Sequence, residues 1–90
     1  MLQTISITVS GAVQGVFFRQ STKNIANQLG IKGQVRNLPD SNVHIIATGT
    51  KEQLDKLIQW CKKGPPRAKV TGVDVKEISL QNFHKFMIVR

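Results

Sequence analysis

The chain has 90 residues, with 13 basic against 5 acidic side chains and a net charge of +8. A chain of this length buries somewhat over about 60% of its unfolded surface, which is enough for one modest core and predicts a single domain over residues 1–90. The sequence has no run of about 18 apolar residues, no basic-then-apolar leader and no lipidation motif, which excludes membrane-spanning and lipid-anchored classes and predicts an unprocessed soluble protein.

The first strand is predicted by the alternation of apolar and polar side chains from Thr4 to Val9. It leads into Gly11–Arg19, after which the spacing of apolar residues predicts a helix through Thr22 and Leu29 that ends at Gly30. A glycine-containing turn between a strand and a helix can direct several backbone N–H groups into one concavity, where the positive end of the helix also favours an anion. Arg19 adds a planar guanidinium that can hold two phosphate oxygens.

An ordinary turn is the alternative interpretation of Gly11–Arg19, because a glycine in a turn often serves only to reach positive φ. The spacing matches neither the phosphate-loop lysine pattern nor the dinucleotide-binding glycine pattern. In that case Val16, Phe17 and Phe18 would only cover the turn or the core. Phe18 is expected to pack inward under both interpretations.

A strand, a tight turn and a returning strand are predicted next, because apolar residues repeat with period two from Ile31 to Val35 and from Val43 to Ala47. The intervening Pro39–Asn42 segment has turn residues, since proline fixes φ and Asp and Asn side chains bond back to the backbone. Asn37 lies at the end of the first of these strands. Its ordinary role would be a hydrogen bond within an Asx-type turn.

The second helix is predicted by a capping box at its start, with Thr50 followed three residues later by Gln53. Gly64-Pro65-Pro66 ends it. Its lone cysteine, Cys61, is expected to be a buried apolar side chain rather than a reactive thiol, and to indicate a reducing compartment, the cytoplasm. The apolar stripe of this helix consists of Leu54, Leu57, Ile58 and Cys61.

Two further strands are predicted over residues 70–78 and 83–89, with Phe86 and Ile88 on one face of the last strand. The order strand, helix, strand, strand, helix, strand, with one more strand at the end, gives two similar halves around a central hairpin. We therefore predict an α+β protein with a ferredoxin-like α/β sandwich, in which both helices cover one face of a mostly antiparallel sheet.

The turn and the hairpin together resemble the acylphosphatase family. One departure from the family pattern is Ser41, which stands where the family usually has glycine, and we expect Asn42 to take the positive-φ position instead. Residues 64–70 and 86–88 also match family patterns, so the resemblance covers the whole chain. The turn is similar to the signature G-x-V-Q-G-V-x-F-R at Gly11, Val13, Gln14, Gly15, Val16, Phe18 and Arg19, and the hairpin to G-x-V-x-N-x-x-D-G-x-V at Gly33, Val35, Asn37, Asp40 and Val43.

The resemblance implies a five-stranded sheet and a hydrolase that cleaves the carboxyl–phosphate bond of acyl phosphates into a carboxylate and inorganic phosphate. It implies that the Arg19 guanidinium clamps the phosphoryl group, that Asn37 orients the attacking water, and that neither metal nor cofactor takes part. No Ser-His-Asp, Cys-His or paired-carboxylate pattern is present, which suits phosphoryl transfer by positioning and charge stabilisation. The backbone N–H groups implied to bind phosphoryl oxygens belong to Gly15, Val16, Phe17, Phe18 and Arg19.

The positive charge makes a nucleic-acid partner a second possibility, since RNA-recognition modules share the ferredoxin-like fold. Those modules stack bases on exposed aromatic residues of the central strands, whereas residues 34–36 and 44–46 contain none. We therefore expect no specific nucleic-acid binding and a charge that attracts anionic substrates. A metal site is not expected either, because there are no paired cysteines, and His44 and His84 are expected at separate surface or edge positions.

Two further functions remain open from the sequence. The chain could be a binding module that keeps the anion site but has lost turnover, or an acylphosphatase-like domain that handles carbamoyl phosphate within a larger maturation protein. The presence of both Arg19 and Asn37 argues against the first, and the short chain argues against the second. We expect a monomer that acts on a small acyl phosphate.

Overall fold

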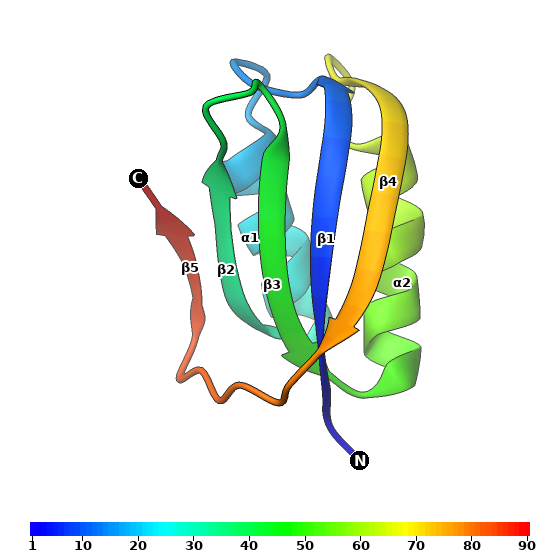
Figure 1. The fold of residues 1–90 in the computed structure, drawn as a ribbon, viewed down its shortest axis with the longest axis vertical. Helices are drawn as coiled ribbons and strands as arrows, with labels where there is room; N and C mark the ends of the chain where they lie inside the picture. The colour runs from blue at the N-terminus through cyan, green and yellow to red at the C-terminus, as the bar shows by residue number, and fades with distance from the viewer.

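Residues 1–90 are all described by the structure, a computed structural model of the chain. Five strands form one sheet in the order β4-β1-β3-β2-β5, and both helices cover the same face of it (Figure 1). Neither helix is long and apolar enough to cross a bilayer. The strands are β1 (Gln3–Ala12), β2 (Lys32–Asn37), β3 (Val43–Gly49), β4 (Lys69–Ile78) and β5 (Phe86–Val89), and the helices are α1 (Phe18–Leu29) and α2 (Lys51–Lys63).

The directions of the strands determine which connections lie at each end of the sheet. β1 is antiparallel to β3 and β4, β2 is antiparallel to β3, and only β5 runs parallel to its neighbour, β2. The predicted ferredoxin-like sandwich with a mostly antiparallel, five-stranded sheet is therefore confirmed. As a result, the end of β1, the start of α1 and the ends of β2 and β5 meet at one end of the sheet, the upper end in Figure 1.

The core lies between the sheet and the two helices. Alternate residues of β1 and β3 face the helices. The buried residues of α2 belong to the predicted apolar stripe. Cys61 is fully buried, and burial raises the pKa of its thiol to about 12, so the side chain is apolar rather than a reactive thiolate. The buried residues of these three elements include Ile5, Ile7, Val9, Val43, Ile45, Ala47, Leu54, Leu57 and Cys61.

Helix α1 begins at Phe18, one turn before the predicted apolar pattern at Thr22. Packing explains the earlier start, because the buried Phe18 ring lies against Trp60 of α2 with ring centroids 5.4 Å apart. The Thr22 hydroxyl donates to the Phe18 carbonyl at 2.7 Å. Phe18 packs inward as predicted, and Arg19 consequently belongs to the first turn of the helix.

The hairpin turn differs from the prediction, because Ser41 and not Asn42 adopts positive φ, at 78°. Asp40 holds Asn42 in place: the Asn42 backbone N–H donates to Oδ1 at 3.1 Å and its side-chain amide to Oδ2 at 3.3 Å. The Asn42 carbonyl also accepts from the Leu38 N–H at 2.8 Å. These bonds leave the left-handed conformation to the small, exposed Ser41.

The sheet face without helices holds the segment that joins β4 to β5. The hydroxyls of Thr4 and Thr48 lie 2.7 Å apart. The Gln81 N–H donates to Thr4 Oγ1 at 2.9 Å, and the Thr48 hydroxyl donates to the Gln81 carbonyl at 2.7 Å. This network fixes the segment at the lower end of the sheet in Figure 1, so β5 begins at Phe86 rather than at residue 83. Phe86 is buried and Ile88 half-buried, as their common face predicts.

His44 lies on the same open face, half-buried, with its Nε2 atom 2.8 Å from the Ser6 hydroxyl oxygen. It occupies the surface of a central strand rather than an edge, because β1 and β2 flank β3. Burial lowers the pKa of His44 below 6.5, and the positive charge of Arg36 lowers it further. His84 is exposed and precedes β5, so it lies at the surface but outside the strand.

Replacing Leu57 by Ala tests the packing of α2 on the sheet. Leu57 is fully buried, so its truncation leaves a core cavity and should lower the free energy of unfolding by about 2–5 kcal/mol. Urea denaturation measures the loss. A loss below about 0.5 kcal/mol, typical of a surface position, would contradict this packing.

A pH dependence of stability should follow from His44. Because its pKa is lower in the folded state, the unfolded chain binds the proton first, and stability should fall as pH drops below about 6.5. His44→Gln removes the titration and should flatten that part of the profile. Melting temperatures of both proteins between pH 7.5 and pH 5 provide the measurement, and parallel profiles would refute this assignment.

Candidate active site

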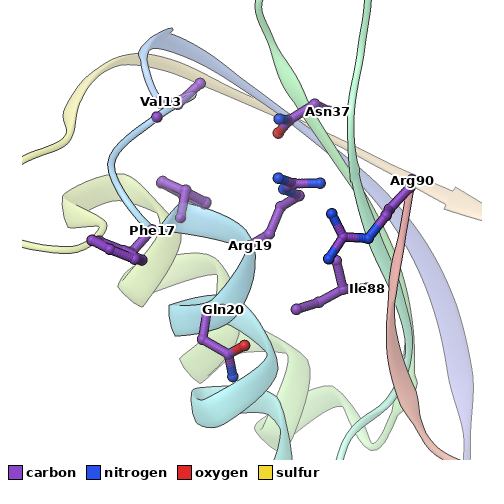
Figure 2. Close-up of a pocket in the computed structure, with 9 residues that line it drawn as sticks. Val13, Phe17, Arg19, Gln20, Asn37, Ile88 and Arg90 are labelled. Atoms are coloured by element: carbon purple, nitrogen blue, oxygen red, sulfur yellow. The ribbon is translucent and has the colours of Figure 1, made fainter.

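A cavity of about 320 Å³ lies at the end of the sheet where β1, β2, β5 and the start of α1 meet. Figure 2 shows Arg19, Asn37 and Arg90 directed into this space from three different elements. Residues from both motifs found in the sequence therefore reach one site. The residues that line the cavity include Gly15, Phe17, Arg19, Asn37, Ile88 and Arg90.

Two left-handed residues shape the turn between β1 and α1. Gly15 has φ of 75°, which glycine adopts without steric cost. Phe17 has φ of 61°, an uncommon value for a residue with a bulky side chain, and the residue is 74% exposed. The next residue, Phe18, is anchored in the core. The backbone thus reverses within a few residues and presents the start of α1 to the cavity.

The N-terminus of α1 has no protein partner for its first amides. No side chain caps it, no acidic residue lies in its first turn, and the Ser21 N–H donates to the Phe17 carbonyl at 3.0 Å. The preceding N–H groups of the first turn therefore lack intrahelical acceptors. These groups and the positive end of the helix would favour an anion at this position.

Gln14 connects the turn to the hairpin. Its side-chain amide donates to the carbonyls of Leu38 and Asn42, both at 2.9 Å. These two carbonyls lie on either side of the hairpin tip, just beyond Asn37. The connection therefore fixes the end of β2 relative to the start of α1, and with it Asn37 relative to Arg19. The sequence matched Gln14 to the family signature but did not indicate this role.

Asn37 is not occupied by a structural hydrogen bond. The Asx-type interaction of the hairpin belongs to Asp40, which accepts from Asn42. The half-buried Asn37 side chain has no hydrogen-bond partner within the chain and faces the cavity. Its amide is therefore available to a ligand or to water.

The predicted phosphate-binding segment enters the cavity in part. Gly15, Phe17, Phe18 and Arg19 line it, whereas Val16 does not and instead packs against the core. Sequence reasoning missed Arg90, which follows the last strand and carries no motif. The parallel pairing of β5 with β2 would have been needed to place it beside Asn37. No group of three or more His, Cys, Asp or Glu side chains lies close enough together to hold a metal ion.

The cavity is strongly electropositive. Arg19 and Arg90 both line it, and no Asp or Glu side chain does. The ion pairs of the chain, Lys51–Asp55 and Lys56–Glu52, both lie on α2. Two guanidinium groups and a helix N-terminus therefore face one space that no Asp or Glu side chain lines, which makes it suited to an anion.

Comparison with known proteins agrees with this geometry. The acylphosphatase family profile matches residues 5–88. The chain belongs to the acylphosphatase family. It is 51% identical to an acylphosphatase of Acaryochloris marina over 96% of this chain and 92% of the relative. The resemblance stated from the turn and the hairpin is thereby confirmed.

Solved structures show the same relationship. The fold matches the crystal structure of acylphosphatase from Bacillus subtilis with a TM-score of 0.95 and 38% identity, over 100% of both chains. It also matches full-length HypF in the phosphate- and nucleotide-bound form, with a TM-score of 0.90 and 29% identity. The chain covers 12% of HypF, so this acylphosphatase-family fold also occurs as a small part of a larger protein.

Replacing Gln14 by Met tests the connection between the turn and the hairpin. Methionine keeps the length but removes both donated hydrogen bonds, which should lower the free energy of unfolding by about 1–2 kcal/mol. Acyl phosphate hydrolysis should fall by about tenfold or more, because Asn37 and Arg19 lose their relative position. Gln59→Met, at an exposed position of α2, is the matched control. Equal behaviour of the two variants in urea unfolding and in hydrolysis would contradict the role of Gln14.

Proposed function

We propose that this chain hydrolyses the carboxyl–phosphate bond of acyl phosphates, giving a carboxylate and inorganic phosphate, by direct attack of water. The single observation that carries the proposal is the convergence on one cavity of an uncapped helix N-terminus, the Arg19 guanidinium and an unbonded Asn37 amide. Membership of the acylphosphatase family supports the same reaction.

The phosphoryl group binds at the turn. Backbone N–H groups between Gly15 and Arg19 donate to its oxygens, and the Arg19 guanidinium clamps two of them. These donors are fixed before the substrate arrives, because Gln14 holds the turn and Phe18 anchors the start of the helix. Charge that develops on the phosphoryl oxygens in the transition state is therefore stabilised without reorganisation.

Asn37 positions the attacking water. Its side-chain carbonyl oxygen accepts a hydrogen bond from the water and holds the water opposite the leaving carboxylate. The cavity lining contains no His, Asp, Glu or Cys that could take the proton of the water. The proton passes to a phosphoryl oxygen of the substrate, and the carboxylate leaves without a general acid.

We further propose that residues 1–90 act as a single domain and a monomer in the cytoplasm, with a small acyl phosphate and no specific nucleic acid as partner. The near-complete coverage of relatives of similar length supports the single domain. The open sheet face offers Ser6, His44 and Arg36 but no exposed aromatic residue on its central strands, which argues against base stacking.

Benzoyl phosphate, with excess EDTA present, provides the direct test of the reaction. Purified protein should release benzoate and phosphate at a rate that EDTA does not change, since the amides and Arg19 supply the positive charge. Binding of inorganic phosphate without hydrolysis of benzoyl phosphate would instead indicate a binding module.

Substitutions of Arg19 and of Asn37 should affect phosphate binding and turnover differently. Arg19→Ala should weaken inhibition by inorganic phosphate and abolish nearly all turnover, because the guanidinium contacts phosphate before and during transfer. Arg19→Lys keeps the charge but not the two-pronged geometry and should remain severely impaired. Asn37→Ala should bind phosphate at close to normal affinity while kcat falls by about a hundredfold or more.

Kinetics, phosphate inhibition constants and melting curves distinguish these outcomes. Asn82→Ala, which removes an exposed amide from the segment at the opposite end of the sheet, is the control. A folded Asn37→Ala protein with nearly full activity would end the assignment of Asn37 to water.

A further inference from the structure

The cavity is larger than a phosphoryl group requires. Its volume is about 320 Å³, and one water molecule takes about 30 Å³. The space therefore holds about ten water-sized groups, well beyond one phosphorus atom and its oxygens. The remaining space is available to the acyl part of the substrate that the proposed reaction requires.

Sheet register brings Arg90 to the cavity next to the end of β2. β5 pairs in parallel with β2, and Val89 lies opposite Arg36. The next residues, Arg90 and Asn37, therefore lie at corresponding positions beyond the same pair. In Figure 2 the Arg90 guanidinium is directed into the cavity from the side of Ile88, and the Arg19 guanidinium lies between it and the turn.

The charge of Arg90 has no partner in the protein. No Asp or Glu side chain lines the cavity, and both ion pairs of the chain are on α2. The phosphoryl group already has the turn amides and Arg19. Arg90 consequently offers a second guanidinium, separated from the turn, to a second negative charge.

We propose that Arg90 is a specificity-determining residue that binds a second anionic group on the acyl moiety, so that this chain prefers acyl phosphates of dicarboxylic acids to those of neutral acids. Ile88 and the exposed Phe17 ring provide apolar contacts for the carbon skeleton between the two anionic ends. The inference rests on the proposed acyl phosphate hydrolysis and adds the substrate class of that site.

Benzoyl phosphate and its 3-carboxy and 4-carboxy derivatives test the proposal. The measured quantity is the ratio of kcat/KM for each carboxylated substrate to that for benzoyl phosphate, compared between proteins so that intrinsic reactivity cancels. In Arg90→Gln the ratio for the better carboxylated substrate should fall by about tenfold, the loss expected for one hydrogen bond to a charged group. Arg90→Glu should lower it further, because it places like charges together.

Arg67→Gln is the matched control, since it removes one positive charge at an exposed position that does not line the cavity. An equal fall of the ratio in Arg67→Gln would reduce the effect to net charge and overturn the proposal. Equal losses for carboxylated and neutral substrates in Arg90→Gln, with weaker inhibition by inorganic phosphate, would place Arg90 on the phosphoryl group and also overturn it. If the unmodified protein hydrolyses none of the three substrates, the proposed function itself fails; if it hydrolyses them and the ratio does not change in either Arg90 variant, only the assignment of Arg90 fails.

Discussion

The functional end of this molecule depends on the two hydrogen bonds that Gln14 donates across the gap between the β1–α1 turn and the β2–β3 hairpin. The turn carries the uncapped start of α1 and Arg19, and the hairpin carries Asn37, but these segments belong to different connections of the sheet. Backbone pairing alone does not join them, because β1 and β2 are separated by β3. One amide side chain therefore converts two independent loops into a single site of defined geometry.

The two helices differ in how their N-termini are stabilised. Helix α2 has a complete capping box from Thr50 and Gln53, Glu52 in its first turn and Lys62 and Lys63 in its last. Helix α1 has none of these features at its start. A missing N-cap costs about 0.5–2 kcal/mol of helix stability. The burial of Phe18 against Trp60 offsets that cost and keeps the uncapped amides free for an anion.

Much of the fold could be predicted because its signals are local. Period-two alternation indicated β1 and the hairpin strands, and the spacing of Thr50 and Gln53 correctly marked the start of α2. The start of α1 could not be found in this way, because a helix that leaves its amides for a ligand has no cap residue to reveal it. The positive φ of Ser41 was missed because the hydrogen bonds that Asn42 donates to the Asp40 carboxylate are visible only in three dimensions.

The candidate site likewise contains residues that the sequence could reveal and residues that only the structure reveals. Arg19 and Asn37 could be found from two motifs, whereas Arg90 carries no local signal and depends on the pairing of β5 with β2. The role of Gln14 likewise requires the distance between two loops far apart in sequence. Residues that act through long-range sheet topology are those that sequence patterns describe least well.

The central place of β1 also affects how the protein is made. Its residue Ile7 pairs with Ile45 on one side and with Val75 on the other, so β1 cannot complete both pairings until β4 has been synthesised. At a synthesis rate of about 5–20 residues per second, the first strand waits roughly 3 to 14 s for β4. During that interval a strand with one apolar face has an unpaired edge, which is the condition under which nascent chains associate with one another or with chaperones.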